Sequence, residues 1–313
     1  MNTGIRAAAF GGGHGLAATL QALKGQVGSL TAIVGVSDNG GSSGRLRNEF
    51  GLLPPGDLRM ALTALCSEGD WGQSWAAVLQ HRFRGDGPLG GHALGNLLIT
   101  ALWQQDEDLV GGLRAVGELL GCEGVVLPLS LTPLDVVAQV EMGGALNTVS
   151  GQVEVATASG RVRSVSLVPE DAAATPQALQ AVAEADVLFF GPGSWFSSVM
   201  TSFALPQMRA AVAASSARKV LIANLCSQQG ETQDFSPAEH FLALRAFAPE
   251  VAFDTCLVDS LLLDDELLAA AASLGAKAVS YAFSSDPGAA RHNPIALRRA
   301  IGEHLPRFGG NAL

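Results

Sequence analysis

The first 37 residues have the pattern of a strand, a glycine turn, a helix and a second strand. Apolar runs at 5–10 and 31–37 predict two short buried strands. Between them, leucines at positions 16, 20 and 23 fall on one face of a predicted helix over 16–23. Two strands joined through a helix are parallel, with a right-handed crossover. The chain is therefore expected to fold as an α/β protein with a mostly parallel sheet.

The pattern continues along the chain, with one interruption. Helices are predicted at 58–67, 71–82, 93–105 and 109–121, then at about 196–214 and near 237–248, 264–273 and 294–304. Further α/β strands are predicted at 185–190, 219–224 and 276–281. The interruption contains short strands separated by Gly and Ser turns, predicted at 135–140, 151–156 and 161–167.

We therefore predict one Rossmann-like, three-layer α/β domain over residues 1–313, with a mostly parallel sheet and a β-hairpin-rich excursion. Its parts are an N-terminal βαβ unit with a helical segment (1–124), a β-rich subdomain (125–168) and a second α/β part (169–313).

Charge and cysteine content restrict the class of protein. The net charge of −10 argues against a broad nucleic-acid surface. The four cysteines are far apart and form no CxxC pair, which argues against zinc and favours reduced thiols in a cytoplasmic protein. No signal peptide or membrane span is indicated. General frequencies favour a homodimer if the chain assembles.

The glycine turn after the first strand is typical of anion binding. Gly11, Gly12, Gly13 and Gly15 surround His14 at the start of the predicted helix, where unpaired N–H groups attract phosphate. Leu16 takes the last glycine position of the dinucleotide-binding fingerprint, and no Walker A lysine follows. A bare tight turn is the alternative interpretation.

A second polar stretch follows the second strand, and we predict a loop over 38–47. It contains Asn39, Gly40, Gly41, Ser42, Ser43 and Arg45, whose glycines, hydroxyls and guanidinium suit a phosphate. Asp38, at its start, could hold a ribose hydroxyl, hold a divalent cation or cap a helix.

Other candidate residues also follow strands or begin helices. Asp57, which follows a rigid Pro54–Gly56 turn, could cap a helix or bind a ligand. Arg59 opposes a helix dipole and so favours a bound anion, while His92 and Asn96 share one face of a helix. Gly191, Gly193 and Ser194 belong to a second glycine turn, 191–194, after the strand predicted at 185–190. Asn224 ends the next strand, and Gln228 lies in the polar loop after it. Because parallel strands end at one sheet edge, two glycine turns can lie side by side at a switch point. We assign Asp38 and His92 as catalytic candidates, Asp38 as a weak metal ligand, and the remainder as nucleotide or phosphate ligands.

These motifs resemble the YvcK/CofD family across nearly the whole chain, in the same order. The resemblance rests on Gly11–Gly15, Asp38–Arg47, Pro54-Pro55-Gly56-Asp57-x-Arg59, His92-x-Leu94-Gly95-Asn96, Gly191–Ser194 and Gln229-Gly230-Glu231-Thr232. It is closer to the YvcK branch, the gluconeogenesis factors, than to the CofD branch. It implies a Rossmann-like fold.

The two branches imply different functions. The CofD branch transfers a phospholactyl-type group from a guanosine-activated donor to a deazaflavin alcohol with Mg²⁺, held at the position of Asp38 and Asn39. The YvcK branch is implied to bind UDP-sugars such as UDP-N-acetylglucosamine and to act in cell shape during gluconeogenic growth. This sequence departs from the family at His14, Asn39, Met60 and 223–229. Asn39 replaces the second Asp of the pair and weakens the metal site.

Three functions follow in order of preference. The first is a cytoplasmic protein that binds a nucleotide-sugar and regulates envelope precursor metabolism. The second is a Mg²⁺-dependent transferase of the CofD type, with Mg²⁺ as its cofactor. The third is an NAD-dependent oxidoreductase, which lacks a recognisable acid/base pair for hydride transfer.

Overall fold

Seven parallel strands form the central sheet, in the order β10-β9-β8-β7-β1-β2-β3. The computed structural model describes residues 4–284 and 290–306. The strands are β1 (Arg6–Gly11), β2 (Ser29–Val34), β3 (Val125–Pro128), β7 (Val187–Phe190), β8 (Arg218–Ile222), β9 (Thr255–Asp259) and β10 (Lys277–Tyr281). Chain order reverses between β1 and β7, so these neighbours flank the switch point of the sheet.

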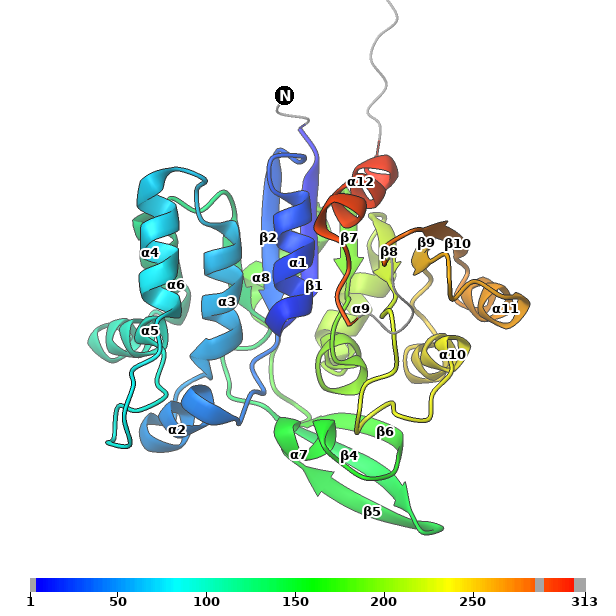
Figure 1. Cartoon of the computed structure of the whole chain (residues 1–313), viewed down its shortest axis with the longest axis horizontal. Coiled ribbons are helices and arrows are strands. Elements are labelled where there is room, and N and C mark those ends of the chain that lie inside the picture. The colour runs from blue at the N-terminus through cyan, green and yellow to red at the C-terminus, as the bar shows by residue number, and fades with distance from the viewer. Residues whose placement is uncertain (1–3, 285–289, 307–313) are drawn as a thin grey trace, which may run out of the picture.

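Helices cover both faces of this sheet (Figure 1). The first half contributes α1 (Gly13–Leu23), α2 (Gly41–Phe50), α3 (Pro55–Leu65), α4 (Asp70–Gln80), α5 (Leu94–Gln105) and α6 (Leu109–Leu120). The second half contributes α8 (Pro176–Glu184), α9 (Pro206–Ala214), α10 (Pro237–Phe247), α11 (Asp265–Ser273) and α12 (Pro294–His304). The last helix returns to contact α1, which brings the two halves of the chain together.

A small antiparallel sheet lies beyond the carboxyl ends of the parallel strands (Figure 1). Its strands, in the order β5-β4-β6, are β4 (Asp135–Met142), β5 (Ala145–Ser150) and β6 (Arg161–Val168). The short helix α7 (Gln152–Ala156) joins β5 to β6. This sheet therefore lies on the side of the molecule where α/β proteins bind ligands.

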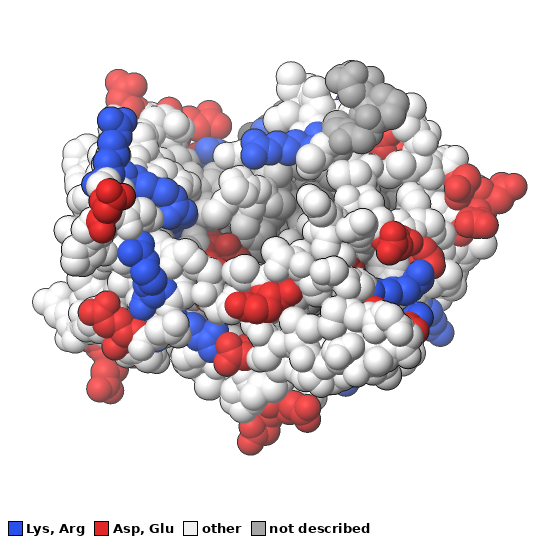
Figure 2. Space-filling view, turned by 60° about the horizontal axis from the view of Figure 1, so that its bottom comes forward, with Lys and Arg blue, Asp and Glu red and all other residues white. Residues whose placement is uncertain are grey.

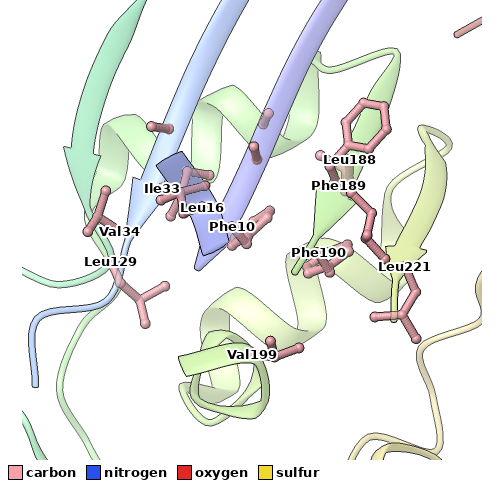
Figure 3. Close-up of a cluster of buried hydrophobic side chains, with 14 of the residues drawn as sticks. Phe10, Leu16, Ile33, Val34, Leu129, Leu188, Phe189, Phe190, Val199 and Leu221 are labelled. Carbon is pink, nitrogen blue, oxygen red and sulfur yellow. The ribbon is translucent and has the colours of Figure 1, made fainter. Parts of the chain in front are cut away.

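The core is densest at the switch point. Phe10 on β1 stacks on Phe190 of β7 with ring centroids 4.7 Å apart (Figure 3). Phe190 also stacks on Phe203, with ring centroids 4.8 Å apart. All three are fully buried. Burying an aromatic side chain of this size contributes roughly 1.5–3 kcal/mol. The two strands that carry the glycine turns are thus fixed relative to each other.

The two glycine turns themselves touch. A Cβ atom at Gly15 would lie 2.0 Å from the carbonyl oxygen of Pro192 and 2.9 Å from the Cα of Gly193. The Thr19 hydroxyl donates a hydrogen bond of 2.8 Å to the carbonyl of Gly191. Only glycine at position 15 permits the N-terminus of α1 to approach the second turn so closely.

The α/β class, the parallel sheet and the β-rich excursion predicted from the sequence are confirmed. Most predicted helices are present, and their ends lie within a few residues of the predicted ones. The strands β3, β5 and β9 were not predicted. The helix predicted over 196–214 is interrupted: one π-helical turn (η1, Trp195–Val199) and one 3₁₀ turn (η2, Met200–Phe203) precede α9. No helix among the described residues is long and apolar enough to cross a membrane.

Two local predictions were wrong. The strand predicted at 151–156 is the helix α7, because the Asn39 side chain caps its first turn by accepting a hydrogen bond from the Val153 N–H. The glycine-rich stretch after Asp38 is a loop only as far as Gly40, since α2 begins at Gly41.

Replacing Gly15 with alanine should destabilise the fold. Alanine has a helix propensity about 1 kcal/mol better than glycine, but the contact with backbone atoms of the second turn outweighs it. We expect a net loss of about 1–3 kcal/mol in the free energy of unfolding, measured with urea. Gly117→Ala is the matched control: it is also helical, its nearest neighbour lies at 3.7 Å, and it should be neutral or stabilising. A Gly15→Ala protein as stable as this control would contradict the close approach.

Candidate functional site

A large cleft opens at the carboxyl ends of the central strands. Its volume is about 1400 Å³, and its walls come from both glycine turns, from α3 and α4, and from the segments after β8 and before α12. Figure 2 shows a hollow on this side of the molecule, with basic side chains on its left wall and an acidic side chain at its margin. Clefts at switch points are the usual ligand sites of open α/β sheets.

The first glycine turn forms one side of this cleft. Gly12, Gly13 and His14 line it where α1 begins. The N–H groups of Gly12 and His14 have no hydrogen-bond partner among the described residues, whereas the Gly13 N–H donates to the Asp57 carboxylate. Free N–H groups at a helix N-terminus can bind a phosphate.

Two carboxylates lie beneath this turn. A Cβ atom at Gly12 would lie 2.3 Å from Asp57 Oδ2, and one at Gly56 would lie 3.1 Å from Asp38 Oδ2. Burial, and then the charge of Asp38, raise the pKa of Asp57 to about 7. Asp38 Oδ1 accepts from the Gly40 N–H at 2.9 Å. Two close carboxylates favour a cation between them or a proton on one of them.

Arg59 supplies a buried positive charge next to these carboxylates. Its side chain is 3% exposed, and one terminal nitrogen donates to Gln80 Oε1 at 2.5 Å. The Nε–H has no partner among the described residues. Burial, followed by the charge of Arg82, lowers the pKa of Arg59 to about 10. A buried guanidinium with an unpaired donor on a cleft wall is suited to an anionic ligand.

The second glycine turn forms the opposite side. Gly193 and Ser194 line the cleft together with Asn224 and Gln228, which follow β8. Asn224 Oδ1 accepts from the Gly193 N–H at 3.0 Å, and Gln228 Oε1 accepts from the Trp195 N–H at 2.9 Å. The two turns predicted to lie side by side therefore do so, with the polar segment after β8 packed against the second.

The structure brings together about half of the residues singled out from the sequence. Those that line the cleft are Gly12, Gly13, His14, Asp38, Arg59, Gly193, Ser194, Asn224 and Gln228. Those that do not line it are Gly11, Asn39, Gly40, Gly41, Ser42, Ser43, Arg45, His92, Asn96 and Gly191.

Several residues outside the cleft have structural contacts instead. Ser42 on α2 contacts His92 Nδ1 at 2.9 Å and accepts from Asn96 Nδ2 at 3.0 Å, so this buried group joins α2 to α5. Burial lowers the pKa of His92. Arg45 is exposed and donates to the carbonyls of Pro88 and Gly90.

Asn39 also has a structural partner. Its Nδ2 donates to Glu154 Oε2 at 2.6 Å, and its Oδ1 accepts from the Val153 N–H at 3.0 Å. An aspartate there would face the Glu154 carboxylate without a donor. Asn39 therefore joins the loop after β2 to α7 and does not line the cleft.

Sequence reasoning did not assign some cleft residues to the site. Asp57 was interpreted as a helix cap or a ligand with nearly equal weight, and Gln80, Arg82 and Arg291 were not assigned. Gln80 and Arg82 lie at the end of α4 or just beyond it, where only tertiary packing brings them beside Arg59. The turn Pro54–Asp57 was the available signal for Asp57.

Comparison with known proteins gives consistent results. A family model described as 2-phospho-L-lactate transferase CofD matches residues 8–295. A Mycobacterium tuberculosis protein provisionally named as a gluconeogenesis factor is 42% identical over 301 residues, covering 94% of this chain and 88% of that protein. The Bacillus subtilis gluconeogenesis factor is 36% identical over 260 residues, covering 83% and 80%. The crystal structure of a UPF0052 family member from Bacillus halodurans has a TM-score of 0.85 at 33% identity, covering 95% and 98%.

Asp57→Asn should stabilise the free protein more at high pH than at low pH. The folded-state pKa of Asp57 is above its ordinary value of 3.8, so its contribution to stability is present at low pH and is lost as pH rises from about 3.8 through about 7. A shift of one pKa unit corresponds to about 1.4 kcal/mol, and the partial exposure of Asp57 reduces this effect. The free energy of unfolding of the variant, relative to wild type, should therefore grow by about 1–3 kcal/mol between about pH 5 and pH 8.

Urea unfolding at both pH values measures this difference. Asp70→Asn, which removes an exposed carboxylate from the first turn of α4, is the control and should give no such growth. An equal effect of Asp57→Asn at both pH values would show that Asp57 is not desolvated.

Proposed function

The chain belongs to the CofD family, together with the gluconeogenesis factors, and from that membership we propose that it binds a nucleotide-sugar in the cleft at the switch point. The diphosphate lies against the first glycine turn and Arg59. One observation carries this proposal: the free N–H groups at the start of α1 and the buried cation Arg59 line the same cleft.

Size and chemistry of the cleft support a ligand larger than a phosphate. Its volume of about 1400 Å³ exceeds the roughly 300–1,000 Å³ typical of a small-molecule site. Its wall beyond the first turn carries neutral hydroxyl and amide side chains such as Ser194, Ser227 and Gln229. These groups suit sugar hydroxyls and the edge of a base.

We further propose that the ligand is a UDP-sugar such as UDP-N-acetylglucosamine. The support is the resemblance to the YvcK branch and the gluconeogenesis-factor names of the relatives. In this proposal the protein is cytoplasmic and regulates envelope precursor metabolism according to the ligand level. The four cysteines are unpaired, which agrees with a reducing compartment.

Isothermal titration with UDP-N-acetylglucosamine tests the proposal. The wild-type protein should bind, and Arg59→Gln should weaken binding about tenfold to a hundredfold, because a charge-assisted hydrogen bond contributes about 1.5–3 kcal/mol.

Arg45→Gln is the matched comparison, since Arg45 is exposed on α2 and outside the cleft. It should change the affinity by less than about twofold. Absence of binding to the wild-type protein, or an equal loss in both variants, would overturn the proposed site.

A second candidate is a Mg²⁺-dependent transferase of the CofD type. The paired carboxylates of Asp38 and Asp57 favour it, because Mg²⁺ prefers oxygen ligands and is often held by one or two carboxylates plus ligand phosphates. Among the described residues no three His, Cys, Asp or Glu side chains form a metal cluster by themselves. Bound Mg²⁺ would supply positive charge to the phosphates. Asp38 and Asp57 would orient the ligand from beneath the first turn.

Magnesium should strengthen nucleotide binding through these two residues. Titrations with Mg²⁺ and with EDTA should differ by about fivefold or more in affinity for the wild-type protein. The difference should disappear in Asp38→Asn and in Asp57→Asn. Variants that keep the full magnesium effect would contradict this assignment of the ligands.

A further inference from the structure

Three backbone donors where the second glycine turn enters η1 are already occupied by side chains. The N–H groups of Gly193, Trp195 and Ser197 donate to Asn224 Oδ1, Gln228 Oε1 and Glu231 Oε2, at 3.0, 2.9 and 3.0 Å. These acceptors come from one segment, Asn224–Thr232, which follows β8. The segment thus fills positions that a phosphate would otherwise take at a strand-to-helix turn.

Further hydrogen bonds fix this segment in place. Asn224 Nδ2 donates to the Gly193 carbonyl at 2.8 Å, and Gln228 Nε2 donates to the Ser194 hydroxyl at 3.3 Å. The Gln228 N–H donates to Thr232 Oγ1 at 2.8 Å. Glu231 is 2% exposed, so its carboxyl group is held behind the turn rather than in the cleft. A phosphate could use these N–H groups only by displacing the whole segment.

The first turn is different. It keeps the N–H groups of Gly12 and His14 unpaired, and Arg59 is the buried cation beside it. The cation on the other side, Arg291, is exposed, and it belongs to the loop before α12 rather than to the turn. The cleft therefore has one half with free donors beside a buried positive charge. In the other half, the Ser194 N–H alone among the donors of Gly193–Trp195 has no partner within the described residues, and the neighbouring side chains are neutral and hydrogen-bonded.

We propose that the Asn224–Thr232 segment closes the second glycine turn to phosphate and makes it the wall for the uncharged, hydroxyl-bearing part of the ligand. This inference rests on the proposed function for the identity of the ligand, and it adds the direction in which that ligand lies. Asn224 and Gln228 are positioning residues: they shape the turn, while Ser194, Ser227 and Gln229 on the cleft wall offer groups that match sugar hydroxyls.

Inorganic pyrophosphate is the probe that separates the two halves, because it carries the charge without the nucleoside or sugar. By isothermal titration, Arg59→Gln should weaken pyrophosphate binding about tenfold or more. Gln228→Ala should leave pyrophosphate within about twofold of wild type while weakening UDP-N-acetylglucosamine about tenfold. Gln233→Ala, an exposed glutamine just beyond the segment, is the control and should change neither.

Amide hydrogen exchange tests the same inference on the wild-type protein, so the result does not depend on whether a variant folds. Pyrophosphate should slow exchange in a peptide covering Gly11–Leu20 and leave one covering Phe190–Met200 unchanged. Protection of the second peptide alone, an equal loss of pyrophosphate binding in Gln228→Ala and Arg59→Gln, or no pyrophosphate binding at all would overturn the inference.

The test of the division of the cleft and the test of UDP-sugar binding can give different results. Pyrophosphate binding lost in Arg59→Gln and kept in Gln228→Ala supports the division of the cleft even if no UDP-sugar binds. UDP-sugar binding with both variants equally impaired toward pyrophosphate supports the function and contradicts the division.

Discussion

The contact between the two glycine turns is the constraint on which the site depends. Gly15 lies so close to Pro192 that no side chain fits between the turns. The stacked rings of Phe10 and Phe190 hold the two strands in register immediately behind them. The strand order reverses between β1 and β7, so the chain continues in opposite directions from the two turns. A cleft therefore opens beside the turns at the carboxyl edge of the sheet. The position of the cleft is therefore a consequence of packing in the core.

The two sides of this cleft differ in their charged groups and in their free hydrogen-bond donors. The first turn combines free N–H groups, the buried Arg59 and a pair of carboxylates, of which Asp57 has a pKa raised by burial. The free donors and the close carboxylates of the first turn lack compensating partners until an anion, a proton or a cation binds there. At the second turn, side chains that follow β8 satisfy the N–H groups of Gly193, Trp195 and Ser197 without a ligand. The first turn is thus the half of the cleft that combines free donors with a buried cation.

The sequence predicted the fold class and the pairing of the glycine turns, because both follow from local patterns: apolar strands, glycines at their ends and parallel connections. It was less successful where a contact joins distant residues. The alternating residues 151–156 resemble a strand, but they form α7, whose first turn is capped by Asn39 from a distant part of the chain. His92 and Asn96 lie close together, but His92 precedes α5, and both contact Ser42 rather than the cleft. Asn39, taken from the family resemblance as the residue that weakens the metal site, has an amide that bonds to α7.

A crystal structure of the protein with bound UDP-N-acetylglucosamine tests the central claim most directly. The account predicts the diphosphate within hydrogen-bond distance of the Gly12 and His14 N–H groups and of the Arg59 guanidinium. It also predicts the sugar or nucleoside against Ser194, with the bonds from Asn224 and Gln228 to the second turn unbroken. A diphosphate seated on the Gly193 and Trp195 N–H groups, or bound on α2 beside Arg45, would contradict it.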